Sequence, residues 1–540
     1  MSSSHTSIAD GPRFVDHSKV RHPSLIPVAD SSGASAADAS AIAAGIPSRA
    51  LMQRAGAAAA AEIATRFADR LDDGVVIATG PGNNGGDGWV IARALHAVGI
   101  GVRVVECVAS RTEDAQAERV LAIEAGVGFT TSAESLFAGG ERIAVDALLG
   151  TGLTADEPLR MPIAAGVGAL HALAARGRAI VAIDVPSGLD ASTGLHVGAP
   201  RCVLTLTFGT IKRGQLVARD LCGVIVALDI GLGAHAERAS SASLATASWF
   251  RDALPPIAAD AHKGTRKNIA IIGGAAGMAG AVILAARAAL RSGAGIVKCV
   301  VAPESLLALQ KAEPAALSAA WPFHDDEFVS QVANWADAIL IGPGLGREKA
   351  REMVERTLLT FPGPVVLDAD ALNAFAGDVD ALLPLIGSRA ALLTPHPAEF
   401  ARLLDESVEE VLLHRFEMPA VAALRGGSTV LLKGVPTIVT SPDGSSMIVA
   451  EGTPVLATGG AGDVLGGIAA TLLAQTGDAQ LAGALAAFAH GRAAATVNAR
   501  QVRGFTLDDV LAALPSVWSL EVPGRRPPIL AELPAVGEEA

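Results

Sequence analysis

The segment ATGPGNNGGDGWVIARAL, at residues 78–95, combines glycines with polar side chains where an apolar run ends and a helical pattern begins. Such a point exposes backbone N–H groups and the positive end of a helix dipole, which attract phosphate. Glycines allow a tight turn and close approach of a ligand to the backbone, as expected for Gly80, Gly82, Gly85 and Gly86. A purely structural turn is the alternative, and the polar side chains of Asn83, Asn84 and Asp87 count against it.

Two further polar loops follow apolar runs in the same half of the chain. Asp146 lies in VDALLGTGL, and Asp184 and Ser187 lie in AIDVPSGLD. Ligands of an open parallel sheet collect outside the carboxyl ends of its strands, so we expect these loops to converge on one crevice. The oxygen atoms of Asn84, Asp146 and Ser187, without sulfur or imidazole, suit a hard cation better than zinc or copper.

A second set of motifs lies in the other half of the chain. It comprises HKGTRKNIAIIGGAAGMAGA (262–281), IGPGLG (341–346), LDADALN (367–373), LTPHPAEF (393–400), LKGVPT (432–437) and ATGGAGDVLGGI (457–468). In the last of these, a G-x-G-D element opens a helix, which places N–H groups at a transferring phosphoryl group while Asp463 faces the hydroxyl to be activated. A helix start without chemistry is the alternative.

Apolar runs that alternate with helical patterns must position these loops. They lie at 75–79, 102–108, 142–149 and 179–185, and again at 268–274, 296–302, 338–344, 364–370, 390–396 and 429–434. Continuous apolar runs broken by helices indicate parallel strands covered on both faces. We therefore predict an α/β protein, with an N-terminal Rossmann-like parallel-sheet domain followed by a second α/β domain.

The length of 540 residues exceeds what one hydrophobic core supports, so at least two domains are expected. Residues 234–260 are rich in small residues and contain Pro255-Pro256, which suits a boundary. We predict a disordered tail before a helix that begins near Ala36 and a frayed tail after Pro523. The predicted ranges are 1–35, 36–240, 241–520 and 521–540.

Charge and cysteine content exclude several classes of function. The net charge of −13 disfavours attraction to nucleic acid or anionic lipid, and no secretion signal or membrane span is evident. No CxxC pair occurs among the four cysteines, so a zinc knuckle or a disulfide framework is not expected and a reducing cytoplasm fits. A homo-oligomer is compatible with the sequence, although no interface can be read from it.

The N-terminal motifs resemble those of the NAD(P)H-hydrate epimerase family, from about Ala36 to Leu232. Members of that family interconvert the R and S hydrates at C6 of the reduced nicotinamide ring and bind K+. The resemblance implies that Asn84, Asp146 and Ser187 ligate K+, and we choose Asp184 as the acid/base carboxylate, with a purely structural role as the alternative. The implied substrate contacts are Asn83, Asn84, Gly85, Gly86, Asp87, Gly150, Thr151, Gly152, Leu153, Thr154, Ala155, Asp156 and Asp184.

The C-terminal motifs, from about His262 to Gly504, resemble the ribokinase-like superfamily and, within it, the ADP-dependent NAD(P)H-hydrate dehydratases of bacteria. Members of that family phosphorylate the C6 hydroxyl of the S hydrate, after which phosphate leaves and the ring is restored. The resemblance implies ADP and Mg2+, with AMP and phosphate as products, although the residues themselves are compatible with ADP or ATP. Met278 stands where the family often has an aromatic residue.

The same resemblance assigns roles to individual residues, with Asp463 as the base. It implies nucleotide contacts by Lys433, Gly434, Val435, Pro436, Thr437 and Gly462, and contacts to the hydrated dinucleotide by Ala281, Gly344, Gly346, His396 and Asp463. His396, between two prolines, has a packed loop residue as its alternative. The group Asp368, Asp370 and Asn373 could meet magnesium or phosphate, or could cap a helix.

Together these inferences predict a bifunctional enzyme, an isomerase joined to a lyase, that repairs hydrated NADH and NADPH. Its partners would be the hydrated dinucleotides and an adenine nucleotide. One alternative is a small-molecule kinase, because G-x-G-D is shared across the ribokinase-like superfamily. Another is an N-terminal half that binds ligands without catalysis.

Overall fold

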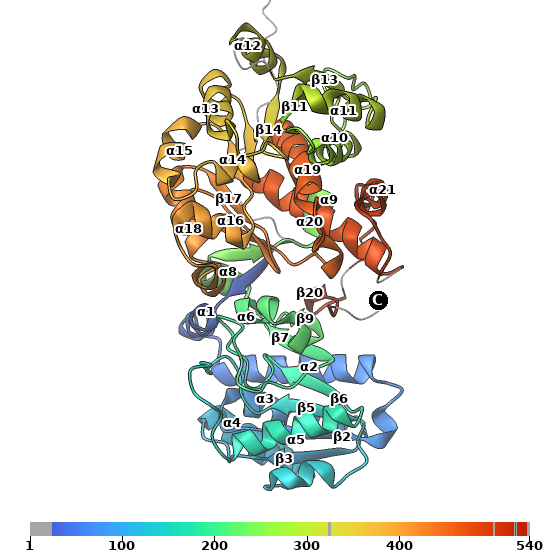
Figure 1. The fold of residues 1–540 in the computed structure, drawn as a ribbon. Coiled ribbons are helices and arrows are strands. Elements are labelled where there is room, and N and C mark those ends of the chain that lie inside the picture. Colours follow the sequence, from blue (N-terminus) through green and yellow to red (C-terminus); the bar gives the residue numbers. More distant parts are fainter. Residues whose placement is uncertain (1–23, 322–325, 501–502, 523, 525, 537–540) are drawn as a thin grey trace, which may run out of the picture.

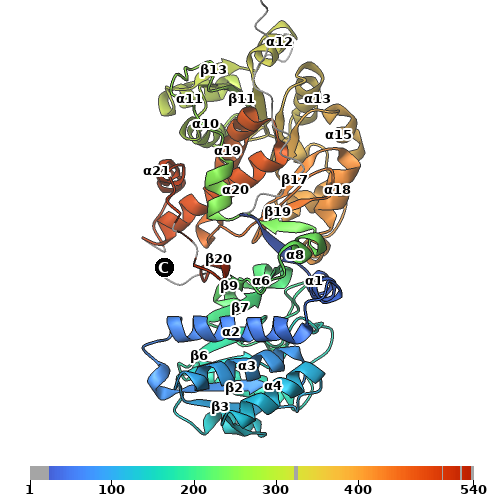
Figure 2. The ribbon, with the colours of Figure 1, turned by 180° about the vertical axis from the view of Figure 1, so that it is seen from behind.

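The computed structural model describes residues 24–321, 326–500, 503–522, 524 and 526–536. Two α/β bodies lie end to end, and short elements of both halves of the chain fill the junction between them (Figures 1 and 2). None of the helices in the described ranges combines the length and apolar character needed to cross a bilayer. The predicted α/β class is confirmed.

The N-terminal body is built on an eight-stranded sheet in the order β20-β9-β7-β6-β5-β2-β3-β4, parallel except for β20. Its strands are β2 (Val75–Thr79), β3 (Val102–Glu106), β4 (Gly128–Thr130), β5 (Ile143–Ala147), β6 (Ala179–Ile183), β7 (Leu204–Phe208), β9 (Val224–Leu228) and β20 (Ile529–Leu533). The four strands predicted in this half coincide with β2, β3, β5 and β6.

Helices cover both faces of this sheet because successive strand residues are apolar. Val75 and Ile77 point into one core, while Val76 and Ala78 point into the other. The first core contains α2 (Ser48–Arg66), α3 (Asn83–Ala97) and α4 (Glu113–Glu124), and the second contains α5 (Ile163–Ala175).

The C-terminal body is built on a twelve-stranded sheet in the order β13-β12-β11-β14-β15-β16-β17-β18-β19-β10-β1-β8. Its own strands are β11 (Asn268–Ile272), β12 (Ile296–Val301), β13 (Leu317–Ala320), β14 (Ala338–Ile341), β15 (Val365–Leu367), β16 (Ala391–Leu393), β17 (Thr429–Leu432), β18 (Thr437–Thr440) and β19 (Ser446–Val449). The strands from β13 to β17 are parallel, and β18 is antiparallel to both of its neighbours. The six strands predicted in this half are confirmed.

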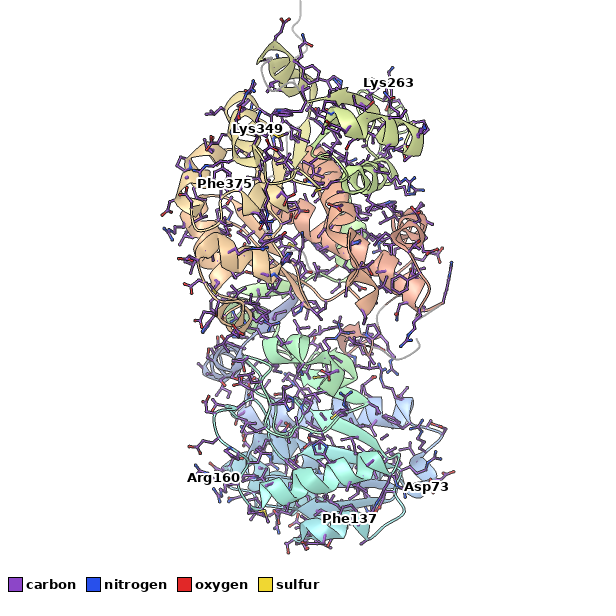
Figure 3. The ribbon with its side chains drawn as sticks, in the orientation of Figure 1. Asp73, Phe137, Arg160, Lys263, Lys349 and Phe375 are labelled. Carbon is purple, nitrogen blue, oxygen red and sulfur yellow. The ribbon has the colours of Figure 1, made fainter. Side chains whose placement is uncertain are left out.

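Two layers of helices enclose this sheet, and buried side chains fill the space between the ribbons, as Figure 3 shows around Phe375. One core includes α10 (Ala279–Arg291), α19 (Ala461–Thr476), α20 (Ala479–Asn498) and α21 (Leu507–Val517), and the other includes α12 (Asp326–Trp335), α13 (Ala350–Thr360), α14 (Asp370–Asn373) and α15 (Val379–Ile386). The remaining helices are α11 (Leu306–Ala312), α16 (Pro397–Leu404), α17 (Val408–Leu413) and α18 (Met418–Gly426).

The two halves of the chain exchange strands. From the first half, β1 (Ile26–Ala29), β8 (Ile211–Lys212) and β10 (Ala242–Leu244) join the sheet of the C-terminal body, where β10 pairs with β19, β1 with β10, and β8 with β1. In return, β20 from the end of the chain pairs with β9. The junction therefore has its own hydrophobic core, to which both halves contribute, for example Val28, Leu216, Phe416, Ile448 and Leu533.

Polar contacts reinforce the junction. Arg213 donates to Glu417 across 2.6 Å, and its guanidinium lies 5.0 Å from the ring centroid of Phe416. Arg219 donates to the carbonyl of Ala450 across 2.9 Å. These two arginines belong to α6 (Arg213–Val217) and α7 (Arg219–Cys222).

The two predicted tails are corrected by this exchange, because both contain ordered strands. Strand β1 and the first residues of helix α1 (Ser31–Ala43) lie within the predicted tail 1–35, whose first 23 residues are outside the described part. The predicted boundary at 234–260 contains α8 (Gly233–Ala239), β10 and α9 (Ala247–Ala253). The predicted tail 521–540 contains β20. These strands are only three to five residues long and carry no periodic signal, so only pairing with distant segments identifies them.

The exchange predicts that the end of the chain stabilises the N-terminal body. Leu533→Ala should lower the free energy of unfolding of this body by about 2 kcal/mol or more, because the buried leucine packs in the junction core. The midpoint of thermal unfolding is measured for each variant, and hydrogen exchange reports the protection of the backbone amides of β9. Val98→Ala, which shortens an exposed aliphatic side chain of the same body, is the control, and equal midpoints for the two variants would contradict the prediction.

Two candidate active sites

The predicted glycine-rich loop leads from β2 into α3, whose N-cap is Gly82. Its glycines are required by close backbone contacts: a Cβ on Gly80 would lie 1.8 Å from the carbonyl oxygen of Leu148, and one on Gly85 would lie 2.1 Å from that of Gly80. Gly82 has no neighbour within 4 Å of such an atom. The glycine-rich loop is thus held against the turn after β5. The sequence analysis predicted that these two loops would converge.

Asn84, Asp146 and Ser187 come together at this point from three loops. The Ser187 hydroxyl donates to Asp146 Oδ1 across 2.6 Å, and the Ser187 N–H donates to Asp146 Oδ2 across 2.8 Å. Asn84 Nδ2 donates to the carbonyl of Leu149 across 2.8 Å. The other amide atom, Asn84 Oδ1, is buried without a partner in the described part of the chain. A buried oxygen without a partner, in a cluster with a carboxylate and a hydroxyl, fits a hard cation.

Asp184 lies directly after β6 with a φ of 65°, a conformation that non-glycine residues rarely adopt and that aims its carboxylate across the sheet edge. Its Oδ1 accepts from Lys212 Nζ and, across 3.1 Å, from the Thr207 hydroxyl. Gln215 Nε2 donates to the Asp184 carbonyl across 2.6 Å, which fixes the strained turn.

Lys212 is a site residue that the sequence analysis missed. It is 2% exposed, and besides Asp184 its Nζ donates to Thr207 Oγ1 at 2.8 Å and to two backbone carbonyls of the β7–β8 turn at 3.2 and 3.3 Å. A buried ammonium needs such a complete set of acceptors. Its only local signal is a lysine after the apolar run LTLTFGTI, which is too weak to assign a role.

Asn84, Asp184 and Lys212 face one cavity of about 500 Å³, which Asp38 from α1 and Asp87 from α3 also line. Asp146 and Ser187 are fully buried and do not line it. Burial raises the pKa of Asp87 well above its usual value, and the nearby Asp184 and Asp38 raise it further. Of the predicted substrate contacts, Asn83, Asn84, Asp87, Gly150, Thr151, Gly152, Leu153 and Asp184 line the cavity. The others do not line it: Gly85 and Gly86 lie in the buried first turn of α3, and Thr154, Ala155 and Asp156 follow beyond the lining.

The second site is organised by an ion pair between Lys433, after β17, and Asp368, after β15. Lys433 Nζ donates to Asp368 Oδ1 across 2.6 Å. Burial acts to lower the pKa of Lys433, but Asp368 and Glu399 outweigh it and the pKa is raised, so the lysine is charged. Asp370 Oδ2 accepts from the Gly346 N–H across 2.9 Å.

The helix-capping alternative for this acidic group is not observed, because no side chain caps α14. Asp368 binds Lys433, and Asp370 holds the loop that carries Gly344 and Gly346. Asn373 Oδ1 is buried without a partner among the described residues.

Asp463 lies in the first turn of α19, beside this pair. Burial raises its pKa to about 7, with Asp368 as the next contribution and Lys433 opposing both. A Cβ on Gly462 would lie 3.1 Å from Lys433 Nζ, so the glycine leaves the space in front of the ammonium open. A carboxyl with a pKa near 7 at a helix start is suited to take a proton from a hydroxyl while the helix N–H groups meet a phosphoryl group.

The remaining predicted residues surround this centre. Gly344 has a φ of 53° and lies against Met278 and Ala281, at the start of α10. His396 Nδ1 accepts from the N–H groups of residues 398 and 399, so the histidine caps α16. Val435, Pro436 and Thr437 follow in the turn to β18, where the Thr437 hydroxyl donates to the Gly434 carbonyl across 3.1 Å.

His490, on the apolar helix α20, is a second group that the sequence analysis passed over. It is buried, and burial followed by the charge of Lys433 lowers its pKa to about 4. A neutral imidazole therefore lies near the Lys433 side of the site. No sequence motif marks it, because it stands within an alanine-rich helix.

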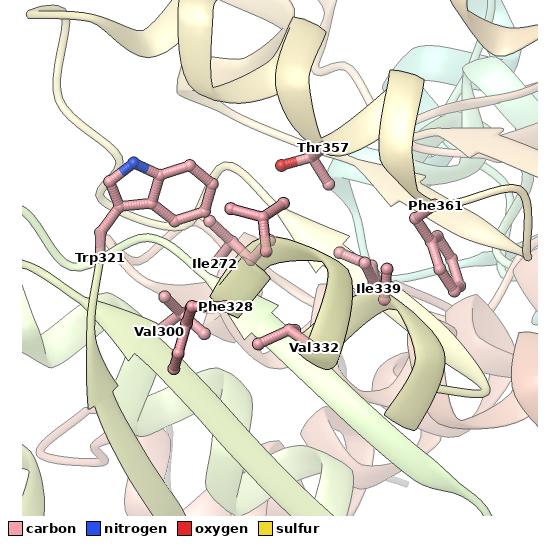
Figure 4. A pocket seen from close by; sticks show the side chains of 10 residues that line it. Ile272, Val300, Trp321, Phe328, Val332, Ile339, Thr357 and Phe361 are labelled. Carbon is pink, nitrogen blue, oxygen red and sulfur yellow. The ribbon is translucent and has the colours of Figure 1, made fainter. Parts of the chain in front are cut away.

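A small apolar cavity beneath α12 lies apart from both centres (Figure 4). It is enclosed by Ile272, Val300, Trp321, Phe328, Val329, Val332, Ala333, Ile339, Thr357 and Phe361. Its lining includes no charged side chain, so it belongs to the packing of the body.

A body with a G-x-G-D helix beside a lysine–aspartate pair, joined to a body with an oxygen-lined pocket, defines a two-site α/β enzyme. Family models agree: residues 269–516 match NAD(P)H-hydrate dehydratase, and residues 48–214 match the YjeF-related protein N-terminus. The bifunctional NAD(P)H-hydrate repair enzyme Nnr of Salinibacter ruber is 37% identical over 88% of this chain and 92% of its own length. The chain belongs to the family of bifunctional NAD(P)H-hydrate repair enzymes.

A second relative, from Escherichia coli, agrees with this assignment. The Escherichia coli enzyme of the same name is 34% identical over 87% of this chain and 90% of its own length. Among solved structures, an ADP/ATP-dependent NAD(P)H-hydrate dehydratase from Bacillus subtilis, co-crystallised with ATP and Mg2+, is 27% identical, covers 51% of this chain and 96% of its own, and has a TM-score of 0.44. The family resemblance predicted from the sequence is confirmed by the relatives.

The glycine-rich loop predicts a sharp contrast between two alanine substitutions. Gly85→Ala should displace the loop and cost about 1 to 3 kcal/mol of stability, because its Cβ would collide with the Gly80 carbonyl. Gly82→Ala should be tolerated, because the space around it is open and its φ is −96°. Thermal unfolding and amide exchange over residues 80–90 measure the difference, and similar behaviour of the two variants would refute the loop geometry.

Proposed function

We propose that the chain repairs hydrated NADH and NADPH. The N-terminal body interconverts the R and S hydrates, and the C-terminal body dehydrates the S hydrate at the expense of ADP, giving NAD(P)H, AMP and phosphate. The observation that carries this proposal is Asp463, poised with a pKa of about 7 beside the Lys433–Asp368 pair, in the same chain as the Asp184–Lys212 pocket. The two family matches, one for each body, support it.

In the N-terminal site, inversion at C6 requires loss and return of the hydroxyl with movement of protons. Lys212 Nζ donates to Asp184 Oδ1 and holds this carboxylate in place, where it would take a proton from a water molecule that attacks C6. The loop of Asn83 and Asn84 at the start of α3 offers N–H groups to the phosphates of the dinucleotide. The same cavity is lined by this loop and by Asp184.

Potassium is the cation proposed for the oxygen cluster behind the loop. Asn84 Oδ1, the Asp146 carboxylate and the Ser187 hydroxyl would hold it, and it would supply positive charge near the anionic part of the substrate. The unpartnered Asn84 Oδ1 supports this choice.

In the C-terminal site, Asp463 would take the proton of the C6 hydroxyl as that oxygen attacks the terminal phosphoryl group of the nucleotide. Lys433 and the N–H groups at the start of α19 would neutralise the charge of the transferred group. Phosphate then leaves more readily than hydroxide, and the ring double bond returns. Asp370 and Asn373 would hold Mg2+, which would supply charge neutralisation at the phosphates; the unpartnered Asn373 Oδ1 supports this.

We further propose that the residues predicted from the sequence bind the substrates: His396 would contact the hydrated dinucleotide, and the turn from Lys433 to Thr437 would contact the adenine nucleotide.

We also propose that the enzyme is located in the cytoplasm, because its four cysteines are buried and unpaired, as expected of a reducing compartment. Its partners would be the hydrated dinucleotides and an adenine nucleotide, without nucleic acid or membrane, and a homo-oligomer is compatible with this function.

The function is tested by absorbance at 340 nm, with purified protein, a known mixture of R and S NADH hydrate, ADP, Mg2+ and K+. Complete recovery of NADH is expected, whereas Lys212→Met should leave the R fraction at its slow spontaneous rate. Replacing K+ with Na+ should slow recovery of the R fraction alone. A stable phosphorylated product in place of NADH would instead support the small-molecule kinase, and NADH from the S fraction alone would support a non-catalytic N-terminal body.

The raised pKa of Asp463 predicts the pH dependence of the dehydratase step. Because the base must be deprotonated, the rate with pure S hydrate should fall about tenfold per pH unit below about 7. Asp463→Asn should lower kcat by about 10²- to 10⁴-fold and abolish this limb. Asp405→Asn, at an exposed left-handed position that asparagine also adopts, is the control. An unchanged pH profile in Asp463→Asn would exclude Asp463 as the base.

A further inference from the structure

Epimerisation at C6 requires proton transfer on both faces of the ring, and one carboxylate can serve only one face. The hydroxyl leaves one face of the ring as water, which requires a proton donor, and water returns to the other face, which requires a base. A single fixed group reaches one face. A second proton-transfer group on a different wall of the cavity is therefore needed.

Helix α1 supplies such a wall. Ala34, Ser35, Asp38 and Ile42, which share one face of the helix at intervals of three and four residues, line the same cavity as Asp184 and Lys212. Ala37 and Ala41 lie on the buried side. Asp38 is thus the carboxyl that α1 presents to the cavity.

The position of α1 is fixed at its N-terminal end. Asp30 caps the helix by accepting from the Gly33 N–H across 2.7 Å, and a Cβ on Gly33 would lie 2.8 Å from the Ala239 carbonyl at the end of α8. Before it, β1 pairs with β8 so that Ala29 lies opposite Lys212. The same ladder therefore positions Lys212 and the helix that carries Asp38.

The electrostatic surroundings of Asp38 differ from those of Asp184. Asp184 is paired with Lys212, whereas Asp38 makes no hydrogen bond or ion pair with the described residues and is open to the solvent of the cavity. The surrounding protein raises the pKa of Asp38, Lys212 opposes this, and Asp184 adds to it. Asp87 also faces it, Asp114 lines the outer cavity, and His235 on α8 is bonded to Ser40.

Asp87 is the competing candidate, and its position is less suitable. It lies beneath the glycine-rich loop on α3 and is only 9% exposed. Asp38 and Asp114 both line the cavity from elements separate from the β-sheet edge of Asp184, but Asp114 accepts a 2.6 Å hydrogen bond from the Ser48 hydroxyl, whereas Asp38 makes no such bond with the described residues.

On the basis of the proposed function, we propose that Asp38 is the second catalytic proton-transfer group of the epimerase site, acting in concert with Asp184 on opposite faces of the hydrated ring. Protonated Asp38 gives its proton to the C6 hydroxyl, the C6–O bond breaks, and the N1 lone pair forms the N1–C6 double bond as water leaves. A second water attacks the other face, Asp184 takes its proton, and the electron pair returns to N1. The site then holds the protonation state suited to the reverse reaction.

The test uses the full-length enzyme, K+ and pure S hydrate of NADH without nucleotide, so that only epimerisation occurs. Formation of the R hydrate is followed by chromatography, and incorporation of ¹⁸O from labelled water reports departure and return of the hydroxyl. The variants are Asp38→Asn and Asp38→Glu, with Asp72→Asn, an exposed carboxyl of the same body, as control. NADH formation after addition of ADP shows in each variant that the chain is folded.

Asp38→Asn is expected to lower kcat for epimerisation and the rate of ¹⁸O incorporation by about 10²- to 10⁴-fold, with KM changed by less than about threefold. Wild-type kcat should fall at high pH, where Asp38 is no longer protonated, and the asparagine variant should lack this limb. Asp38→Glu should restore part of the rate.

Two results would overturn the inference: an increase of KM with kcat and the pH profile preserved, which would make Asp38 a binding group, or no effect on either constant. Failure of the wild-type enzyme itself to epimerise would refute the proposed function and is distinguished from both by the unsubstituted control.

Discussion

The backbone ladder that runs from β19 through β10 and β1 to β8 is the constraint on which the rest of the molecule depends. It makes three short strands of the first half continuous with the sheet of the second, and it ends at Lys212. Because strand pairing fixes register, the ammonium that holds Asp184 has a defined position relative to the sheet. The arrangement of one site therefore depends on the integrity of the other body.

The two sites have a similar arrangement of charged side chains. Each buries a lysine against a carboxylate at the ends of parallel strands, Lys212 with Asp184 and Lys433 with Asp368, and each places a further carboxyl nearby with a raised pKa. Burial is the largest cause of the raised pKa of Asp38 and of Asp463, and the paired carboxylate nearby adds to it in both sites. Each site thus combines a carboxylate held by a lysine with a second carboxyl that has no such partner.

The sequence predicted most of what local patterns can encode. Apolar runs located the parallel strands, and glycine-rich turns located Asn84, Asp184 and Asp463, because close backbone contacts require glycine next to the chemistry. It did not predict β1, β8, β10 or β20, whose identity depends on distant partners. Lys212 and Asp38 were missed for a related reason: a lysine after a strand and an aspartate in an alanine-rich helix read as surface residues until tertiary structure turns them toward one cavity.

The return of β20 to the first sheet has a consequence for synthesis on the ribosome. Domains usually fold in order as they emerge, but here β9 remains an unpaired edge until the last strand has been translated, and β1 similarly waits for β10 and then β19. An N-terminal body that folds before β20 has emerged would therefore expose the backbone groups of β9. Closure of the first sheet depends on a segment that follows the whole C-terminal body.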